Sequence, residues 1–94
     1  MTEDLQQLHA IIHGRVQGVG FRNATQMAAM AQMLTGWVRN NPDGTVEVRA
    51  EGTSEKLEKF LAYLHVGPLG ARVEKVDAVW RVASGNFDSF DMTG

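Results

Sequence analysis

The spacing of the apolar residues switches between two regular patterns along this chain, and the order of the switches restricts what it can fold into. Apolar and polar residues alternate, as in strands with one buried face, over residues 8–13, 37–40, 46–51 and 76–82. Apolar residues recur every three or four positions, as in helices with one buried face, over residues 24–34 and 57–64. The predicted order is strand, helix, strand, strand, helix, strand.

Glycine, proline and hydroxyl residues indicate where these elements begin and end. Gly36 is expected to cap the end of the first helix, and Thr53 or Ser54 the start of the second. The turn Asn41-Pro42-Asp43-Gly44 has proline in its favoured second position, so it is expected to join two strands into a hairpin.

The last third of the chain carries two further signals. Val73 is out of phase with the alternation over residues 76–82, which predicts a β-bulge near Glu74 or Lys75. Residues 87–92 follow a turn of the type Ser-Gly-Asn and predict a short closing strand.

This order, β-α-β-β-α-β with a short strand after it, is that of the ferredoxin-like split βαβ arrangement. We therefore predict an α+β fold in which two helices cover one face of an antiparallel sheet. The 94 residues are expected to form a single domain, residues 1–94, with residues 1–7 as a flexible lead-in because they lack periodicity. Function does not follow from such a fold, because enzymes, RNA-binding modules and sensor domains share it.

Composition removes several classes of function. The chain has no cysteine, which excludes disulfides, thiolate metal sites and cysteine nucleophiles. Its net charge of −2 disfavours binding to the backbone of nucleic acids. The N-terminal segment has Glu3 and Asp4 where a secretory signal would be basic, and no apolar stretch approaches the roughly 18 residues of a membrane span. We expect a cytoplasmic protein without a membrane anchor.

The segment Gly14-Arg15-Val16-Gln17-Gly18-Val19-Gly20-Phe21-Arg22 lies between the first predicted strand and helix. Free backbone N–H groups at a helix start favour an anion, glycine lets the main chain approach it, and the Arg22 guanidinium matches phosphate oxygens. The segment lacks the Lys-Ser/Thr pair of a nucleotide-binding P-loop, and Asn23 stands where a dinucleotide fingerprint needs a third glycine. From these residues alone, it is either a phosphate cradle or a tight connection with Arg22 as a surface charge.

The same segment and a second one, residues 36–52 (GWVRNNPDGTVEVRAEG), closely resemble the two signature segments of acylphosphatases. The resemblance covers about residues 8–92 and includes Thr25-Gln26, Gly67-Pro68 and the closing strand around Phe90. It implies an enzyme that hydrolyses the carboxyl–phosphate mixed anhydride of acyl phosphates to a carboxylate and inorganic phosphate, by attack of water on phosphorus.

The resemblance also implies which residues form the site. Arg22 matches the phosphate-binding arginine of the family, and Asn40 matches the asparagine that orients the attacking water. Backbone N–H groups of the matching phosphate loop would hold the phosphoryl oxygens, and that loop consists of Arg15, Val16, Gln17, Gly18, Val19, Gly20 and Phe21.

Such a sparse site suits this reaction. A carboxylate leaves as a stable anion and needs no strong general acid, so the enzyme has to position a water and stabilise charge on the phosphoryl oxygens. We therefore expect no metal and no cofactor. His9 and His13 would lie on one face of a strand, about 13 Å apart, which is too far for them to hold one ion.

The expected partners are a small acyl phosphate as substrate and inorganic phosphate as product and competitive inhibitor. We expect no nucleic acid, no membrane and a monomer. The alternative is a non-catalytic phosphate- or nucleic-acid-binding module on the same fold, which would tolerate loss of Asn40. Against base stacking, no basic stripe accompanies the aromatic residues that we expect to serve in packing, namely Trp37, Phe60, Trp80 and Phe90.

Overall fold

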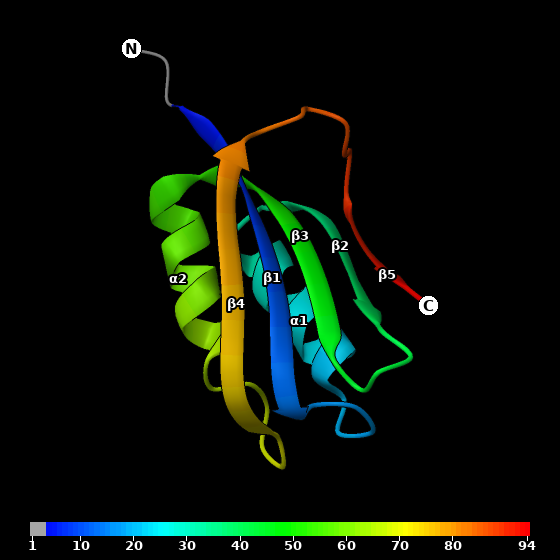
Figure 1. Ribbon diagram of the computed structural model, residues 1–94. Helices are drawn as coiled ribbons and strands as arrows, with labels where there is room; N and C mark the ends of the chain where they lie inside the picture. The colour runs from blue at the N-terminus through cyan, green and yellow to red at the C-terminus, as the bar shows by residue number, and fades with distance from the viewer. Residues whose placement is uncertain (1–3) are drawn as a thin grey trace.

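Five strands and two helices follow the predicted order in the computed structural model of the chain, which describes residues 4–94 (Figure 1). The elements are β1 (Leu5–Arg15), α1 (Phe21–Ala31), β2 (Thr35–Asn40), β3 (Val46–Thr53), α2 (Ser54–Leu64), β4 (Arg72–Val82) and β5 (Phe90–Thr93). Both helices lie behind the sheet in Figure 1. The predicted ferredoxin-like α+β fold, with two helices on one face, is confirmed.

The sheet has the strand order β4-β1-β3-β2-β5, and its first four strands are antiparallel, as predicted. β5 departs from this prediction because it pairs in parallel with β2, so the sheet is mixed. The reason is the path of the chain: after β4 it crosses over the end of the sheet to the opposite edge and enters where β2 also begins (Figure 1). This crossover brings the last residues of the chain beside β2 and α1.

The core lies between the sheet and the two helices. Alternating side chains of β1, β2 and β3 face the helices, and the helical stripes of α1 and α2 meet them, as the two periodicities predict. Burial of these apolar side chains supplies the main driving force for the fold. The largest fully buried residues are Phe21, Phe60, Leu8, Ile12, Leu57, Leu64, Val16, Val38, Val46, Val48 and Thr25.

β1 starts earlier than its apolar pattern predicts. The expected lead-in over residues 1–7 is wrong for residues 5–7, which pair with β3 from Leu5↔Thr53 onwards, whereas residues 1–3 lie outside the described part of the chain. The polar Gln7 does not fit the apolar pattern, so this extension was not predicted. Its side chain can be buried because its Nε2 donates a hydrogen bond to Glu51 Oε2 at 2.7 Å.

Gly36 does not cap α1, and this prediction is corrected. α1 ends at Ala31, and Gly36 lies in β2 with a φ of +141°. A Cβ at this position would collide with the carbonyl oxygen of Arg49 on the adjacent strand β3. Glycine is therefore needed for close approach of two strands and not for the end of a helix.

The structure confirms the expected turn chemistry elsewhere. Thr53 is the N-cap of α2 and accepts from Lys56 N. Between β1 and β4 the register shifts after His13, which leaves Glu74 as the extra residue of the predicted bulge.

The four aromatic residues expected to pack have different surroundings. Phe60 and Phe90 meet edge to face with ring centroids 6.0 Å apart, as expected. Trp80 is 38% exposed and lies on β4, an edge strand of the sheet. Trp37 lies on the sheet face without helices, where the Arg39 guanidinium stands 4.9 Å from its ring centroid.

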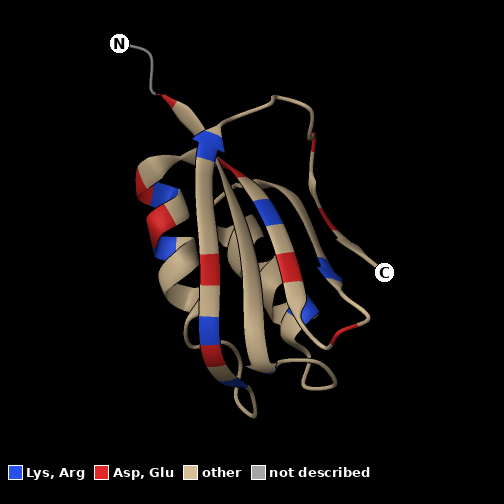
Figure 2. Cartoon of the chain, in the orientation of Figure 1, with Lys and Arg blue, Asp and Glu red and all other residues tan. Residues whose placement is uncertain are grey.

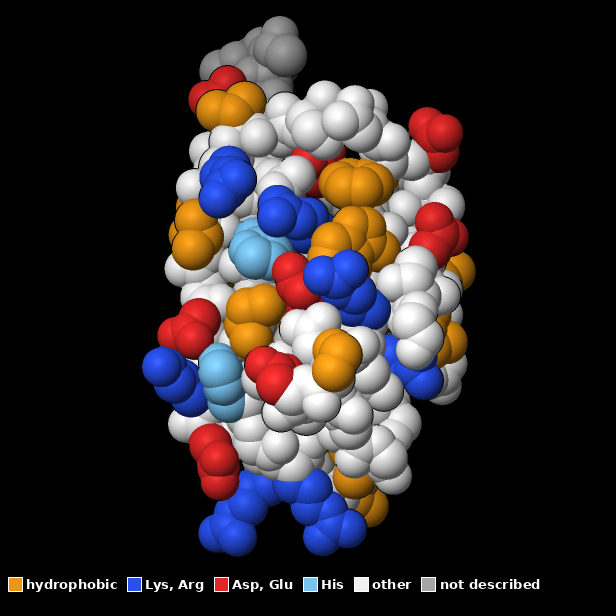
Figure 3. Space-filling view, turned by 45° about the vertical axis from the view of Figure 1, so that its right-hand side comes forward, with side chains coloured by type: hydrophobic (Ala, Val, Ile, Leu, Met, Phe, Trp, Pro, Cys, Tyr) orange, Lys and Arg blue, Asp and Glu red, His pale blue; other side chains and the backbone are white. Residues whose placement is uncertain are grey.

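That open face mixes charged, histidine and apolar side chains (Figure 3). His9 and His13, placed on the wetter face by the sequence pattern, pair there with different carboxylates. The Nε2 atom of His9 lies 2.7 Å from Glu47 Oε2, and that of His13 lies 2.9 Å from Asp77 Oδ2.

Candidate active site

The chain turns from β1 into α1 through residues 16–20, and two glycines make this turn possible. Gly18 and Gly20 have φ values of +75° and +76°, a conformation that side-chain-bearing residues adopt only with strain. Gly20 is also the N-cap of α1 and contributes no side-chain cap. Within residues 4–94, the backbone N–H groups of residues 17–20 donate no hydrogen bond. Unpaired N–H groups at a helix start form a site suited to an anion.

A cavity of about 160 Å³ opens beside this turn. It is lined by Val16, Gly18, Gly20, Phe21, Arg22, Asn23, Asn40 and Met92. One water molecule takes up about 30 Å³ of the liquid, so this space is large enough for a phosphoryl group, with its three oxygens and the bridging oxygen, and one attacking water. The cavity therefore brings Arg22 and Asn40, which come from α1 and β2, to one small space.

Arg22 lies in the first turn of α1 and is the one charged side chain among these lining residues. Its Nη1 donates to the main-chain oxygens of Thr93 at 3.1 Å and Gly94 at 3.0 Å. Its Nε and Nη2 donate to no group within the described residues. The end of β5 thus orients the guanidinium and leaves a planar pair of donors for an oxyanion.

Asn40 is the last residue of β2, directly before the hairpin turn. It is half-buried, and its side chain has no hydrogen-bond partner in residues 4–94. Because residues two apart on a strand share a face, it projects from the same face as the buried Val38, towards the helices. An amide in this position can accept a hydrogen bond from a water and donate one to it.

The hairpin turn that follows Asn40 is braced by its own polar groups. Asn41 N donates to Thr45 O at 2.8 Å, and Asn41 Nδ2 donates to Thr45 Oγ1 at 3.0 Å. Asp43 Oδ1 accepts from both Thr45 Oγ1 and Thr45 N, at 2.7 and 3.0 Å. The Thr45 hydroxyl, followed by its backbone N–H, holds the pKa of Asp43 below its ordinary value of 3.8.

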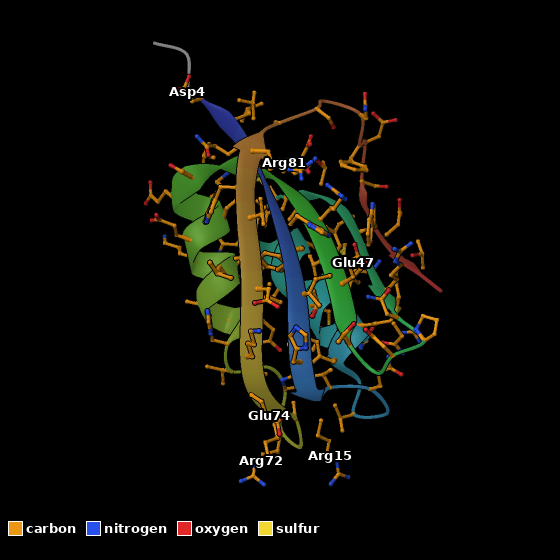
Figure 4. The ribbon with its side chains drawn as sticks, viewed as in Figure 1. Asp4, Arg15, Glu47, Arg72, Glu74 and Arg81 are labelled. Carbon is orange, nitrogen blue, oxygen red and sulfur yellow. The ribbon has the colours of Figure 1, made fainter. Side chains whose placement is uncertain are left out.

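Not every residue of the expected phosphate loop reaches the cavity with its side chain. Arg15 is exposed and points away from the body of the molecule, beyond the end of β1 (Figure 4). Val19 packs against the core instead.

Gln17 has a role that the sequence reasoning missed, since that reasoning used only its backbone. Its Nε2 donates to the carbonyl oxygens of Asn41 at 2.7 Å and Thr45 at 2.9 Å. No local pattern signals these bonds, because they join two segments that are distant in sequence.

Met92 and the main-chain oxygens of Thr93 and Gly94 also contribute to the site without having been expected there. Their contribution follows from the parallel pairing of β5 with β2. A larger cavity, of about 470 Å³, lies beside the start of α2 and is lined by none of the expected site residues.

Within residues 4–94, no group of three or more His, Cys, Asp or Glu side chains could hold a metal ion. The same residues include no helix of the length and apolar character required to cross a membrane.

Comparison with known proteins identifies similar chains. The family model described as Acylphosphatase matches residues 8–92. The acylphosphatase of Salinibacter ruber is 48% identical over 85 residues, which are 90% of each protein. That of Cupriavidus pinatubonensis is 44% identical over 88 residues, 94% of this chain and 96% of the relative. The crystal structure of acylphosphatase from Bacillus subtilis superimposes with a TM-score of 0.92 and 35% identity, covering 95% of this chain and 99% of that one.

Proposed function

The chain belongs to the acylphosphatase family and is an enzyme that hydrolyses acyl phosphates, and we propose that the cavity between Arg22, Asn40 and the glycine turn is its active site. The observation that carries this proposal is the meeting of both side chains at one space the size of a phosphoryl group and a water.

The phosphoryl group binds against the loop. Its oxygens accept from the unpaired N–H groups of residues 17–20 and from the donors of Arg22 that β5 leaves available. The first turn of α1 adds the positive end of the helix dipole. These groups are already oriented before substrate binds, so they stabilise charge that builds up on the phosphoryl oxygens in the transition state.

Asn40 orients the attacking water. Its amide oxygen accepts one hydrogen bond from the water, and the water oxygen is thereby aligned with phosphorus, opposite the carboxylate. As the new oxygen–phosphorus bond forms, the bond from phosphorus to the carboxylate oxygen breaks, and the carboxylate leaves with the bonding electrons. The protons of the water stay on phosphate or pass to solvent, so no general acid is required.

We further propose a cytoplasmic monomer that needs no metal or nucleotide and binds neither nucleic acid nor membrane. Acidic and basic residues alternate along α2, and both signs occur on the sheet (Figure 2), which gives little attraction to a polyanion. The non-catalytic alternative is not favoured by the relatives, which are acylphosphatases.

Hydrolysis of benzoyl phosphate tests this site. The wild-type protein should turn it over, EDTA should leave the rate unchanged, and inorganic phosphate should inhibit competitively. Arg22→Ala should lose turnover and phosphate inhibition together. Asn40→Ala should lose about 10²–10³-fold in kcat with a small change in phosphate inhibition, because it removes one preorganised group that acts in the transition state.

Two further variants sharpen the comparison. Arg15→Ala is the control for Arg22→Ala, because it removes an arginine of the same loop whose side chain points to solvent. Asn40→Asp keeps the size of Asn40 but adds a negative charge near the phosphoryl group, so kcat should fall in a folded protein. Wild-type kcat in Asn40→Ala, or normal phosphate inhibition in Arg22→Ala, would show that the cavity is not the active site.

A further inference from the structure

The side chain of Gln17 connects the two halves of the proposed site. Gln17 belongs to the loop that would hold the phosphoryl group, yet its carboxamide lies against the hairpin that carries Asn40. Its Nε2 donates to Asn41 O at 2.7 Å and to Thr45 O at 2.9 Å. The side chain is half-buried, so these bonds are partly protected from competing water.

The two acceptors are the carbonyls that close the hairpin turn. Asn41 O also accepts from Gly44 N at 3.1 Å, and Thr45 O also accepts from Asn41 N at 2.8 Å. A carbonyl oxygen has two lone pairs, so the amide of Gln17 takes the second position on each. Asp43 braces the same turn through Thr45. Gln17 is therefore bonded to a rigid turn and not to a mobile loop.

Asn40 immediately precedes this turn, and its side-chain amide forms no hydrogen bond within the described residues. Its position relative to the phosphoryl group therefore depends on where the hairpin backbone lies relative to the loop. A displacement of about 1 Å between reacting groups can reduce a rate about 100-fold. The two hydrogen bonds of Gln17 join the phosphate loop directly to this hairpin.

We propose that Gln17 is a positioning residue that sets the distance between the phosphate loop and Asn40. Its side chain acts through the carbonyls of Asn41 and Thr45 and does not touch substrate, whereas its backbone N–H belongs to the phosphate loop. The inference rests on the proposed function, because it requires Asn40 to orient the attacking water. Phosphate binding depends on the loop backbone and Arg22, which belong to the loop and α1 and not to the hairpin. Loss of Gln17 should therefore reduce turnover more than phosphate binding.

Steady-state hydrolysis of benzoyl phosphate by Gln17→Leu tests this. The variant has no donor and a similar size, so kcat should fall between about 10-fold and 100-fold. The inhibition constant of inorganic phosphate should change less than about threefold, as expected when only transition-state alignment is lost. Gln6→Leu, at the opposite end of β1, is the matched control and should keep wild-type kcat.

A double-mutant cycle with Asn40→Ala separates positioning from a general structural effect. If Gln17 acts through Asn40, adding Gln17→Leu to Asn40→Ala should lower kcat less than about twofold further. Thermal melts establish that each variant is folded at the assay temperature. If Gln17→Leu melts below it, Gln17→Met removes the same donors with an unbranched chain.

Wild-type kcat in the folded Gln17 variant would overturn this inference while leaving the proposed function intact. So would a Gln17→Leu change that lowers kcat by the same factor in the wild type and in Asn40→Ala. Wild-type kcat in Asn40→Ala alone would overturn the proposed role of Asn40 and this inference with it.

Discussion

The polar side chains around the site differ in what holds them. The guanidinium of Arg22 is oriented by two main-chain oxygens, and the carboxamide of Gln17 bridges two backbone carbonyls of the hairpin. The amide of Asn40 has no protein partner in residues 4–94, which leaves it available to a water. Thr25, on α1, differs from all three: it is fully buried, and its hydroxyl is the one buried side-chain polar atom without a partner in the described residues.

Replacing Thr25 tests whether this hydroxyl destabilises the fold. An unsatisfied buried polar group costs about 1–3 kcal/mol. Thr25→Val keeps the branched shape and removes the hydroxyl, so the free energy of unfolding should rise by about 1 kcal/mol and the melting temperature by about 4–8 °C. Thr25→Ser, which keeps the hydroxyl and loses a methyl group, should be less stable than wild type. A loss of stability in Thr25→Val would mean that the hydroxyl has a partner, such as a bound water.

At the scale of the element, the end of α1 is built on a residue that does not suit it. Leu34 N donates to Ala29 O and Met33 N to Met30 O, both at 2.9 Å, which is the paired bonding of a Schellman motif. The residue that must turn left-handed is Met33, at a φ of 56°, where helices usually place glycine. Gly36, three residues later, lies in the close contact between β2 and β3 and therefore does not cap the helix.

Met33→Gly should therefore stabilise the protein. The left-handed conformation costs an L-residue about 1–2 kcal/mol, and glycine removes this strain. Glycine also raises the conformational entropy of the unfolded chain, which offsets part of the gain in stability. We expect a net gain of about 0.5–1 kcal/mol in the free energy of unfolding, because Met33 is 75% exposed and loses little packing. Chemical denaturation measures it. Gln32→Gly is the control: its φ of −94° is ordinary, so glycine there should destabilise. Equal effects of the two variants would contradict this reason.

At the scale of the whole molecule, Glu51 ties the sheet to the crossover that leads to β5. Its carboxylate accepts from Gln7 Nε2, from the N–H and hydroxyl of Ser84, and from Gly85 N, at 2.7 to 3.0 Å. Burial alone would raise the pKa of Glu51, but these hydrogen bonds, led by that from the backbone of Ser84, outweigh it and hold the pKa below the ordinary 4.5. One carboxylate on β3 thus holds the chain on its path towards Arg22.

The acid dependence of stability should reveal this role. The pKa of Glu51 is lower in the folded than in the unfolded state, so its contribution is present above pH 4.5 and is lost as pH falls through the folded pKa. At pH 7, Glu51→Gln should be less stable by about 2 kcal/mol, the scale of hydrogen bonds to a charged group. The difference from wild type should shrink towards pH 3.

Urea denaturation at pH 7 and pH 3 makes this measurement. Glu58→Gln on the exposed face of α2 is the matched control and should change stability little at either pH. A deficit of Glu51→Gln that is the same at both pH values would show that the charge of Glu51 does not stabilise the fold.

Most of the fold follows from local patterns. Alternation and helical spacing depend only on which residues face the core, so the element order, the hairpin turn and the bulge at Glu74 could be predicted. The predictions for Gln7 and Gly36 were wrong for the same reason. The role of each depends on an atom of another strand, a carboxylate of Glu51 and a carbonyl of Arg49, which no local pattern specifies.

The same division holds for the site. Local patterns suffice to place a glycine turn with Arg22 after the first strand and Asn40 at the end of the second, because these placements need only neighbouring residues. Long-range packing is what makes the two side chains share a cavity, lets β5 orient Arg22 and brings Gln17 to the hairpin. These contacts depend on which strands pair and in which direction, and burial of the whole core selects that pairing.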